Sequence, residues 1–509
     1  MKDTFYITTP IYYVNDVPHI GHAYTTVACD VIARYHRLRG EKVFFLTGTD
    51  EHGEKVAQSA EEHGVEPKAW ADSMIPRWRE VWERLQISFD DFIRTTEERH
   101  ERPVQEFVQR LYDRGDIYQG IYRGPYCVSC EEFKVEGELL EGNLCPIHGQ
   151  PVEWLEEENY FFRLSKYREE LLRLYEEHPE FVQPRERRNE VVSFVRGGLQ
   201  DLSLSRVSFE WGVPVPWDPK HVIYVWIDAL QNYITAAGFG NDPERFERTW
   251  PADVHVVGKD ILRFHAVIWP AMLMAAGIDV PRTVLAHGWL LVGGQKMSKT
   301  KLTGIHPFEL TDHFGVDAYR YYFLREVQFG QDGNFSWESM LARYNADLAN
   351  GLGNLASRVL AMLGSYFDGA VPERPEGEAG RLQEAGARLA ERFDAAVTSL
   401  DLTAAAAALD EFVREANRYL VEVAPWKLAG DPGRRPELAA VLYEAVEALR
   451  LIAVYASPIM PDAASRLWEQ LGIPEPLAGQ VLPEAARWGS IASGTKTNRG
   501  EGLFPRLDA

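Results

Sequence analysis

Two closely spaced histidines lie where an expected strand at residues 5–10 leads into an expected helix at residues 21–39, in the segment Pro18-His19-Ile20-Gly21-His22. The first turn of a helix presents backbone N–H groups and the positive end of the helix dipole, and both attract a phosphate. The imidazoles add hydrogen-bond donors, and Gly21 lets a nucleotide approach the backbone because it has no Cβ. This pattern predicts a nucleotide site, although a structural helix start explains so short a pattern equally well.

A second basic motif, Lys296-Met297-Ser298-Lys299-Thr300, follows the glycine-containing stretch at residues 292–295. Two lysines on a loop that can swing inward suit a triphosphate, because they offset the charge that grows on the α-phosphate and on the departing pyrophosphate. Taken alone, the segment reads as a solvated basic loop. Together with the histidine motif, in this order, it favours ATP chemistry.

Three of the four cysteines form part of two paired ligand sets, Cys127-Val128-Ser129-Cys130 and Cys145-Pro146-Ile147-His148, with fourteen residues between them. Three thiolates and one imidazole at this spacing can bind zinc tetrahedrally, and four protein ligands close the site, so the metal would be structural. The alternative is free reduced thiols. Cys29 stands apart and is predicted to be a core residue.

Strands and helices alternate at the beginning of the chain and again in its middle, which predicts an α/β fold with a parallel sheet and crossover helices. Further strands are expected at residues 42–46, 222–226, 254–257 and 283–285, and helical patterns at residues 54–85 and from 335 onward, with Ser336 at a helix start. The predicted domains are a Rossmann-like catalytic domain in two halves (1–116 and 218–334), a connective insertion with a zinc knuckle (117–217) and an α-helical bundle (335–509).

Composition limits the possible classes of protein. The 509 residues have a formal net charge of −22, which argues against a protein that coats nucleic acid non-specifically. Four cysteines cannot form a disulfide framework, and we find neither a leader nor a membrane-spanning run, so we expect a cytoplasmic protein.

The two basic motifs are similar to the HIGH and KMSKS signatures of the class I aminoacyl-tRNA synthetases, and this resemblance covers essentially the whole chain. Within that class the chain resembles the methionine-specific family, through the segments at residues 6–15, 47–53 and 225–229, extended by residues 258–261 and 264–265. Thr300 replaces the usual final serine, and residues 301–304 replace a common leucine-glycine-asparagine segment. These departures concern the motion of the loop, not the reaction.

The resemblance implies that the carboxylate of methionine attacks the α-phosphate of ATP, with Mg²⁺ and basic groups offsetting the charge, and that the aminoacyl group then passes to the 3′ end of methionine tRNA. It assigns catalysis to His19, His22, Lys296 and Lys299. It assigns ATP binding to the same four residues and to Gly21, Gly258 and Asp260. It assigns methionine binding to Ile11, Tyr13, Asp50, Trp226, Ala229, Leu230, Tyr233, Ile261, Phe264 and His265. An aromatic box suits a thioether, and Asp50 supplies the carboxylate that an α-ammonium requires.

The same resemblance implies a connective insertion that binds Zn²⁺ and a helical domain that reads the anticodon. The matching residues are Asn354 and Arg358, which lie on one helix face, and Trp426, which could stack an unpaired base. Packing of Trp426 in the core is the alternative.

Other interpretations remain open at this point. A small-molecule nucleotidyltransferase shares the histidine motif and the sheet, but it needs neither the helical domain nor the zinc insertion. An RNA-binding module without catalysis would not need the intact lysines and histidines. Synthetases for isoleucine, valine and leucine carry a much larger insertion. We expect a monomer that charges initiator and elongator methionine tRNA.

Overall fold

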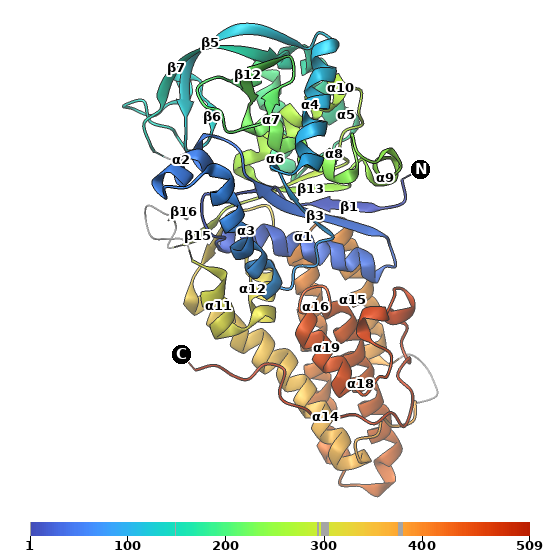
Figure 1. The fold of residues 1–509 in the computed structure, drawn as a ribbon. Helices are drawn as coiled ribbons and strands as arrows, with labels where there is room; N and C mark the ends of the chain where they lie inside the picture. The colour runs from blue at the N-terminus through green and yellow to red at the C-terminus, as the bar shows by residue number, and fades with distance from the viewer. Residues whose placement is uncertain (1, 148, 293–294, 297–304, 375–379, 509) are drawn as a thin grey trace. The chain divides into compact units, whose positions relative to one another are not determined.

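The computed structural model describes residues 2–147, 149–292, 295–296, 305–374 and 380–508 (Figure 1). The chain forms two compact units. The first comprises Met1–Pro18, Val43–Glu83 and Ser88–His287, and the second comprises His19–Lys42, Arg84–Ile87 and Gly288–Ala509. Among the described helices, none is long and apolar enough to cross a membrane.

A parallel sheet forms the centre of the first unit (Figure 1). Its strands follow the order β2-β3-β1-β13-β14-β8, and β4 also pairs with β3; every pairing is parallel. The strands are β1 (Phe5–Thr8), β2 (Tyr12–Tyr13), β3 (Val43–Asp50), β4 (Asp91–Arg94), β8 (Val182–Gln183), β13 (Val254–Gly258) and β14 (Val284–His287). The predicted α/β fold class is confirmed.

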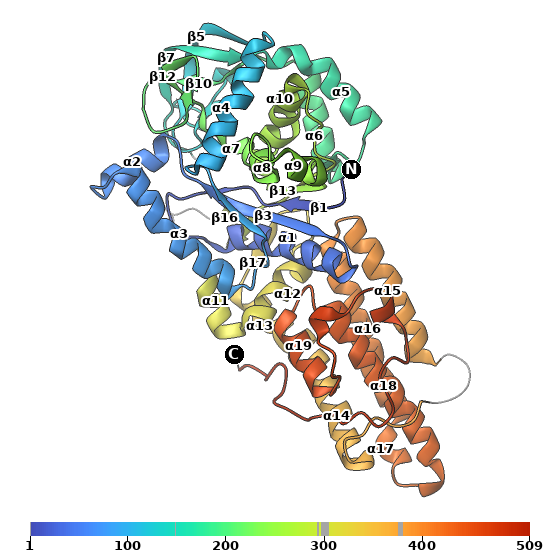
Figure 2. The same ribbon diagram turned by 45° about the vertical axis from the view of Figure 1, so that its right-hand side comes forward.

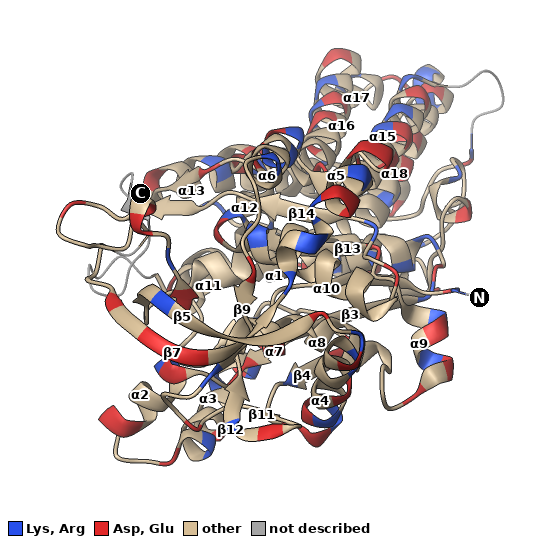
Figure 3. Ribbon diagram, turned by 90° about the horizontal axis from the view of Figure 1, so that it is seen from above, with Lys and Arg blue, Asp and Glu red and all other residues tan. Residues whose placement is uncertain are grey.

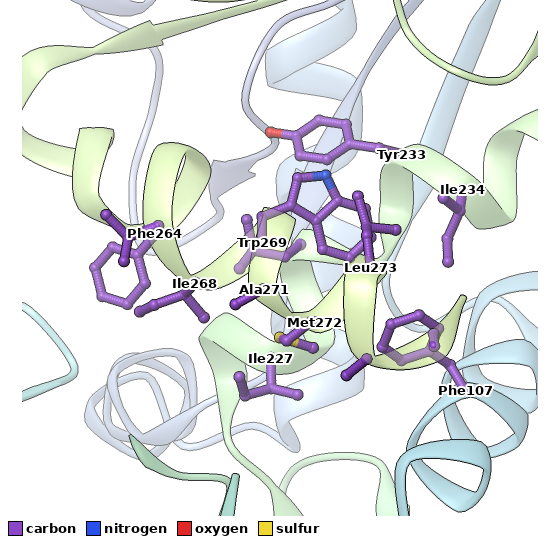
Figure 4. Packing of buried hydrophobic residues seen from close by; sticks show 14 of the residues in the cluster. Phe107, Ile227, Tyr233, Ile234, Phe264, Ile268, Trp269, Ala271, Met272 and Leu273 are labelled. Atoms are coloured by element: carbon purple, nitrogen blue, oxygen red, sulfur yellow. The ribbon is translucent and has the colours of Figure 1, made fainter. Parts of the chain in front are cut away.

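Helices that follow the strands bury a large aromatic core in the same unit. They are α2 (Glu54–Glu62), α3 (Pro67–Arg84), α4 (Glu98–Asp113), α7 (Val225–Leu230), α8 (Asn232–Ala237), α9 (Pro243–Thr249) and α10 (Trp269–Ala276). Figure 4 shows the fully buried Trp269 among Phe107, Tyr233 and Leu273. Because aromatic side chains bury large areas, this cluster fixes α8 and α10 firmly against α4.

The segment predicted as an insertion forms mainly an antiparallel sheet in the order β6-β5-β7-β9. Its elements are β5 (Ile117–Cys127), β6 (Glu132–Phe133), β7 (Glu153–Phe162), α5 (Arg168–Glu177), α6 (Arg185–Arg196) and β9 (Leu202–Ser203). Acidic residues line β7 (Figure 3). The sequence did not reveal that β8, from within this segment, pairs with β14 of the parallel sheet.

One expected strand was wrong. Residues 222–226 do not form a strand of the parallel sheet. Instead β12 (Asp218–Ile223) pairs antiparallel with β10 (Ser205–Arg206) and β11 (Pro214–Val215), and α7 begins at Val225. The apolar run continues from strand into helix, and hydrophobicity alone cannot separate a buried strand from a buried helix over so few residues.

The second unit is mostly helical, as predicted for the end of the chain (Figure 2). It contains α1 (Ile20–Leu38), β15 (Leu290–Val292), β16 (Gln295–Lys296), α11 (Pro307–Phe314), α12 (Val316–Glu326), β17 (Gly333–Phe335), α13 (Trp337–Arg343), a π-helix (Tyr344–Gly353), α14 (Asn354–Phe367), α15 (Arg381–Thr398), α16 (Leu402–Val423), α17 (Pro425–Leu428), α18 (Arg435–Ala456) and α19 (Pro461–Gln470). Ser336 caps α13, because its hydroxyl accepts from Ser339 N–H at 3.1 Å, which confirms the predicted helix start.

A buried guanidinium joins several elements of this unit. Arg320 on α12 donates to Asp30 Oδ2 on α1 at 2.6 Å, and both side chains are fully buried. Its other N–H groups donate to three backbone carbonyls, those of Leu85 (2.9 Å), Pro458 (2.9 Å) and Ile459 (2.8 Å). The rigid fork of an arginine suits this convergent set of acceptors.

Arg320→Met should therefore destabilise the second unit by about 3 kcal/mol or more, because it leaves Asp30 and three carbonyls without their buried donor. Urea denaturation followed by far-UV circular dichroism measures this change. Arg392→Met, which removes the exposed partner of Glu411, should change the unfolding free energy by less than about 1 kcal/mol. Equal stability of the two variants would contradict the assignment.

Candidate functional site

Three aromatic side chains predicted for one pocket meet at the carboxyl end of the parallel sheet. Trp226 on α7 stacks on Phe264 with ring centroids 4.1 Å apart and an interplanar angle of 14°. Tyr13 on β2 meets the edge of Trp226 at 6.3 Å and 82°. Tyr13, Trp226 and Phe264 thus form an aromatic wall. Such a wall packs well against an apolar or sulfur-containing side chain.

A buried hydrogen-bond chain lies beside this wall. Tyr233 donates its hydroxyl proton to His265 Nε2 (2.7 Å), because His265 Nδ1 is the atom that donates to the carbonyl of Ile261 (2.9 Å). Burial lowers the pKa of His265 to about 4, so the ring is neutral at pH 7. The tautomer of His265 is therefore fixed, with its proton on Nδ1.

Asp50 stands at the end of β3, directly opposite Tyr13 in the pairing of β2 with β3. The side chain is buried, and Oδ1 has no hydrogen-bond partner among the residues that the structure describes. Burial, followed by the charges of Asp228 and Glu131, raises the pKa of Asp50 well above its usual value. A cationic group bound at this place would relieve the cost of burying the carboxylate.

The remaining predicted pocket residues lie on the same elements. Ala229 and Leu230 are buried on α7, three and four residues beyond Trp226, so they lie one helical turn further on. Ile11 and Ile261 are partly buried and pack against the core of the first unit.

The predicted nucleotide histidines lie in the second unit and form the start of α1. His19 is the N-cap: its Nδ1 accepts from Gly21 N–H (3.0 Å), and His22 Nδ1 accepts from His19 N–H (3.2 Å). The two rings stack at 3.8 Å. Because each Nδ1 is an acceptor, the proton of each neutral ring resides on Nε2. The motif is thus a capping box that uses histidines in place of serine and glutamate.

Gly258 and Asp260 follow β13 in the first unit. A Cβ on Gly258 would come within 2.6 Å of Asp260 Oδ1, so only glycine allows the carboxylate to approach the backbone this closely. The sequence prediction placed a nucleotide against Gly258. In the structure, the carboxylate of Asp260 occupies the space beside the Gly258 backbone, and this accounts for a glycine at that position. Asp260 is the residue predicted to bind the ribose.

The lysine motif falls partly outside the described residues. The backbone of Lys296 belongs to β16 and pairs with Leu291 of β15. Lys299 and the departures at Thr300 and residues 301–304 lie outside the described part of the chain.

Three predicted metal ligands converge. The Sγ atoms of Cys127, Cys130 and Cys145 all lie within 4.8 Å of one another, and those of Cys130 and Cys145 are 3.5 Å apart. Thiolates around one tetrahedral Zn²⁺ have similar separations, so the cluster fits that ion. His148, the predicted fourth ligand, lies outside the described residues. Cys29 is fully buried, which confirms its prediction as a core residue.

The cysteine knuckle also touches the aromatic wall, a link that the sequence did not reveal. The indole N–H of Trp226 donates to the carbonyl of Cys130 (3.3 Å), and the hydroxyl of Tyr13 donates to the carboxylate of Glu131 (3.3 Å). Tyr224 donates to the carbonyl of Glu131 (2.5 Å). Glu131, directly after Cys130, was the sequence feature that could have indicated this link. Nothing in the sequence showed that its carboxylate faces Tyr13.

The predicted anticodon residues gather on the second unit. Asn354 is exposed at the start of α14, and Arg358 lies one turn further with its guanidinium 5.5 Å from the ring centroid of Trp426. Trp426 is 43% exposed, which argues against the alternative of a core residue. An amide, a guanidinium and an indole thus share one surface.

A family model described as tRNA synthetases class I (M) matches residues 5–146 and 134–360, and this places the chain in that class. A second model, the anticodon binding domain of methionyl tRNA ligase, matches residues 372–508. The methionine–tRNA ligase of Streptomyces coelicolor is 58% identical over 99% of this chain and 97% of its own length, and that of Caldanaerobacter subterraneus is 50% identical over 100% and 80%. The chain belongs to the methionyl-tRNA synthetase family, the ligases that join methionine to its tRNA.

A solved structure agrees with this assignment. Mycobacterium tuberculosis methionyl-tRNA synthetase in complex with methionyl-adenylate has a TM-score of 0.94 and 45% identity to this chain, over 99% of this chain and 100% of that one.

The thiol cluster leads to a prediction about metal content. The purified protein should contain about one zinc ion per chain, and Cys130→Ser should lose it, because a thiolate ligand disappears. Elemental analysis by mass spectrometry measures the content. Cys29→Ser, at a buried cysteine outside the cluster, should retain the metal. Native protein with no zinc, or Cys130→Ser protein with full zinc, would contradict the assignment.

Proposed function

We propose that the aromatic wall and Asp50 bind L-methionine and that the chain converts it with ATP into methionyl-adenylate before transfer to methionine tRNA. The observation that carries the proposal is the buried Oδ1 atom of Asp50, which has no described partner and lies across β2 and β3 from Tyr13. An α-ammonium gives this carboxylate its partner, and the thioether packs against Trp226 and Phe264.

The first step forms one bond and breaks another. A carboxylate oxygen of methionine bonds to the α-phosphorus of ATP, and the bond from that phosphorus to the bridging oxygen of the β-phosphate breaks, which releases pyrophosphate. In the second step a ribose hydroxyl at the 3′ end of the tRNA attacks the methionyl carbonyl, and AMP leaves. Positioning and charge stabilisation supply most of the rate.

The chain's own donors support ATP use. The capping-box geometry keeps a proton on Nε2 of both His19 and His22, so each ring can donate to a phosphate oxygen. The carboxylate of Asp260 suits a ribose hydroxyl, and Lys296 and Lys299 suit the pyrophosphate. Bound Mg²⁺ supplies further positive charge against the triphosphate. The relative solved with methionyl-adenylate supports this chemistry.

Zn²⁺ in the thiolate cluster is a structural ion in this proposal. Cys127, Cys130 and Cys145 hold it, with His148 as the fourth ligand. Its role is to fix the backbone at Cys130 and Glu131, the two residues that accept hydrogen bonds from Trp226 and Tyr13.

Asn354, Arg358 and Trp426 bind the anticodon in this proposal. Trp426 offers an exposed ring for stacking on an unpaired base, and the amide of Asn354 can bond to a base edge. We also propose the four predicted domain boundaries, a monomer in the cytoplasm, and both initiator and elongator methionine tRNA as substrates.

Asp50→Asn tests the amino-acid site. The KM for methionine should rise about ten- to a hundredfold, since a charge-assisted hydrogen bond contributes roughly 1.5 to 3 kcal/mol, while the KM for ATP should change little. Methionine-dependent ATP–pyrophosphate exchange measures both. Asp72→Asn, at an exposed carboxylate of α3, is the control. An unchanged KM for methionine in Asp50→Asn would reject the site.

Trp426→Ala tests the nucleic-acid surface. Loss of one stacking ring costs roughly 1 to 3 kcal/mol, so the kcat/KM for tRNA charging should fall about ten- to a hundredfold, while pyrophosphate exchange stays near the parent rate. Val421→Ala, at another exposed apolar residue of the same region, should behave like the parent. If Trp426→Ala charged tRNA normally, or lost both activities in parallel, the anticodon assignment would be wrong.

A further inference from the structure

Glu131 is a buried glutamate in the segment predicted as an insertion, and its backbone has an unusual conformation. The residue is fully buried, and its φ of +50° lies in the left-handed region. Its N–H donates to the carbonyl of Val128 (3.1 Å), which closes the turn. A side chain strains the backbone in this region, so glycine is the residue that fits most easily. The presence of a glutamate therefore points to a task for its side chain.

One oxygen of this carboxylate caps α2 from a distant part of the chain. The N-cap residue of α2 is Gly53, which has no side chain to cap the helix. Glu131 Oε1 accepts from the N–H of Lys55 at 2.6 Å. Lys55 is the second residue of α2, and its N–H is a usual target of a capping oxygen. The carboxylate also faces the positive end of the helix dipole, which favours a negative charge.

The same carboxylate packs on the turn that follows Asp50. A Cβ on Gly53 would come within 2.3 Å of Glu131 Oε2 and within 2.8 Å of Oε1, so only glycine leaves room for the carboxylate. Lys55 makes a contact in the other direction, because its Nζ donates to the carbonyl of Ser129 (3.3 Å). The start of α2 is thus joined to the segment around Glu131 by several contacts.

The other oxygen reaches the proposed methionine site. Glu131 Oε2 accepts from the hydroxyl of Tyr13 (3.3 Å), and Tyr13 lies opposite Asp50 in the pairing of β2 with β3. The backbone carbonyl of Glu131 accepts from the hydroxyl of Tyr224, which lies two residues before Trp226. One residue therefore contacts the strand beside Asp50, the turn after Asp50 and the start of the helix that carries Trp226.

We propose that Glu131 is a positioning residue for methionine binding, because its carboxylate holds Tyr13 and the turn after Asp50 in a fixed arrangement. Glu131 acts through the hydroxyl of Tyr13 and through the backbone of Gly53 and Lys55, not through contact with the amino acid. This inference rests on the proposed methionine site at the aromatic wall and Asp50.

A direct effect of the negative charge is the alternative explanation. The charge of Glu131 contributes, after burial and Asp228, to the raised pKa of Asp50. Glutamine separates the two effects, because it retains an acceptor for the Lys55 N–H and a donor for the Tyr13 oxygen but carries no charge. Glycine removes the side chain and suits the left-handed backbone, so it adds no strain of its own.

The KM for methionine in pyrophosphate exchange tests the proposal. Glu131→Gly should raise it about tenfold, because two hydrogen bonds are lost, whereas Glu131→Gln should stay within about twofold of the parent. Neither variant should change the KM for ATP. Asn143→Gly is the matched control, because Asn143 is an exposed residue of the same segment with a φ of +55°. It should match the parent.

Two further measurements examine each contact of the carboxylate. Hydrogen–deuterium exchange at the start of α2 should be faster in Glu131→Gly than in the parent and in Glu131→Gln, because Lys55 N–H loses its acceptor. Tyr13→Phe removes the hydroxyl that bonds to Glu131. In that background Glu131→Gly should raise the KM for methionine by a smaller factor than in the parent, because one of the two bonds is already absent.

A merely structural role would lower the active fraction of Glu131→Gly, and so its apparent kcat, without a change in the KM for methionine; that result would overturn the proposal. An equal rise of the KM in Glu131→Gln and Glu131→Gly would assign the effect to charge and would overturn it too, as would unchanged hydrogen exchange in Glu131→Gly. If Asp50→Asn retains the parent KM for methionine, the proposed site itself fails. If Asp50→Asn behaves as expected and Glu131→Gly retains the parent KM, this inference alone fails.

Discussion

The cost of burying a carboxylate at the end of β3 governs the organisation of the first unit. In the proposed methionine site, burial would strengthen the attraction of Asp50 for a cationic group, but the same burial raises the pKa of its carboxyl. The two neighbouring buried carboxylates have partners of their own: Arg94 pairs with Glu51, and His52 bonds to Asp228. Asp228 on α7 also bonds to His100 of α4, and His100 bonds to Thr235 of α8, so these three helices are tied to the turn that carries His52. Packing of Trp269 and its neighbours then keeps the helices in place.

The second unit uses buried charge for a different purpose. The buried guanidinium of Arg320 meets Asp30 and three carbonyls from two separate segments, those of Leu85 and of Pro458 and Ile459. The result is a fixed connection between α1, which begins at the histidine capping box, and the end of α18. Trp426, whose ring is partly exposed, lies on α17 of the same unit.

Motifs with local chemistry could be predicted from the sequence, whereas long-range partners could not. The histidine turn, the three clustered cysteines, the cap at Ser336 and the parallel sheet depend on spacing and periodicity over a few residues. Asp228, His100 and Glu131 gave no such signal, because their significance arises from side chains more than seventy residues away in the sequence, such as His52 for Asp228. The wrong prediction of a parallel strand at residues 222–226 has the same cause. The antiparallel partners β10 and β11 determine which sheet this segment joins, and an apolar run in the sequence does not reveal those partners.

The pairing of β8 with β14 has a consequence for the modularity of this chain. Strand β8 comes from the middle of the segment that also carries the thiolate cluster, and it forms the edge of the parallel sheet. That segment is therefore not an appendage that could be excised or exchanged between relatives at its two ends alone. Its removal would uncover the N–H and C=O groups of β14 and leave an open edge that invites aggregation. Any shortened chain must either retain β8 or provide another strand in its place.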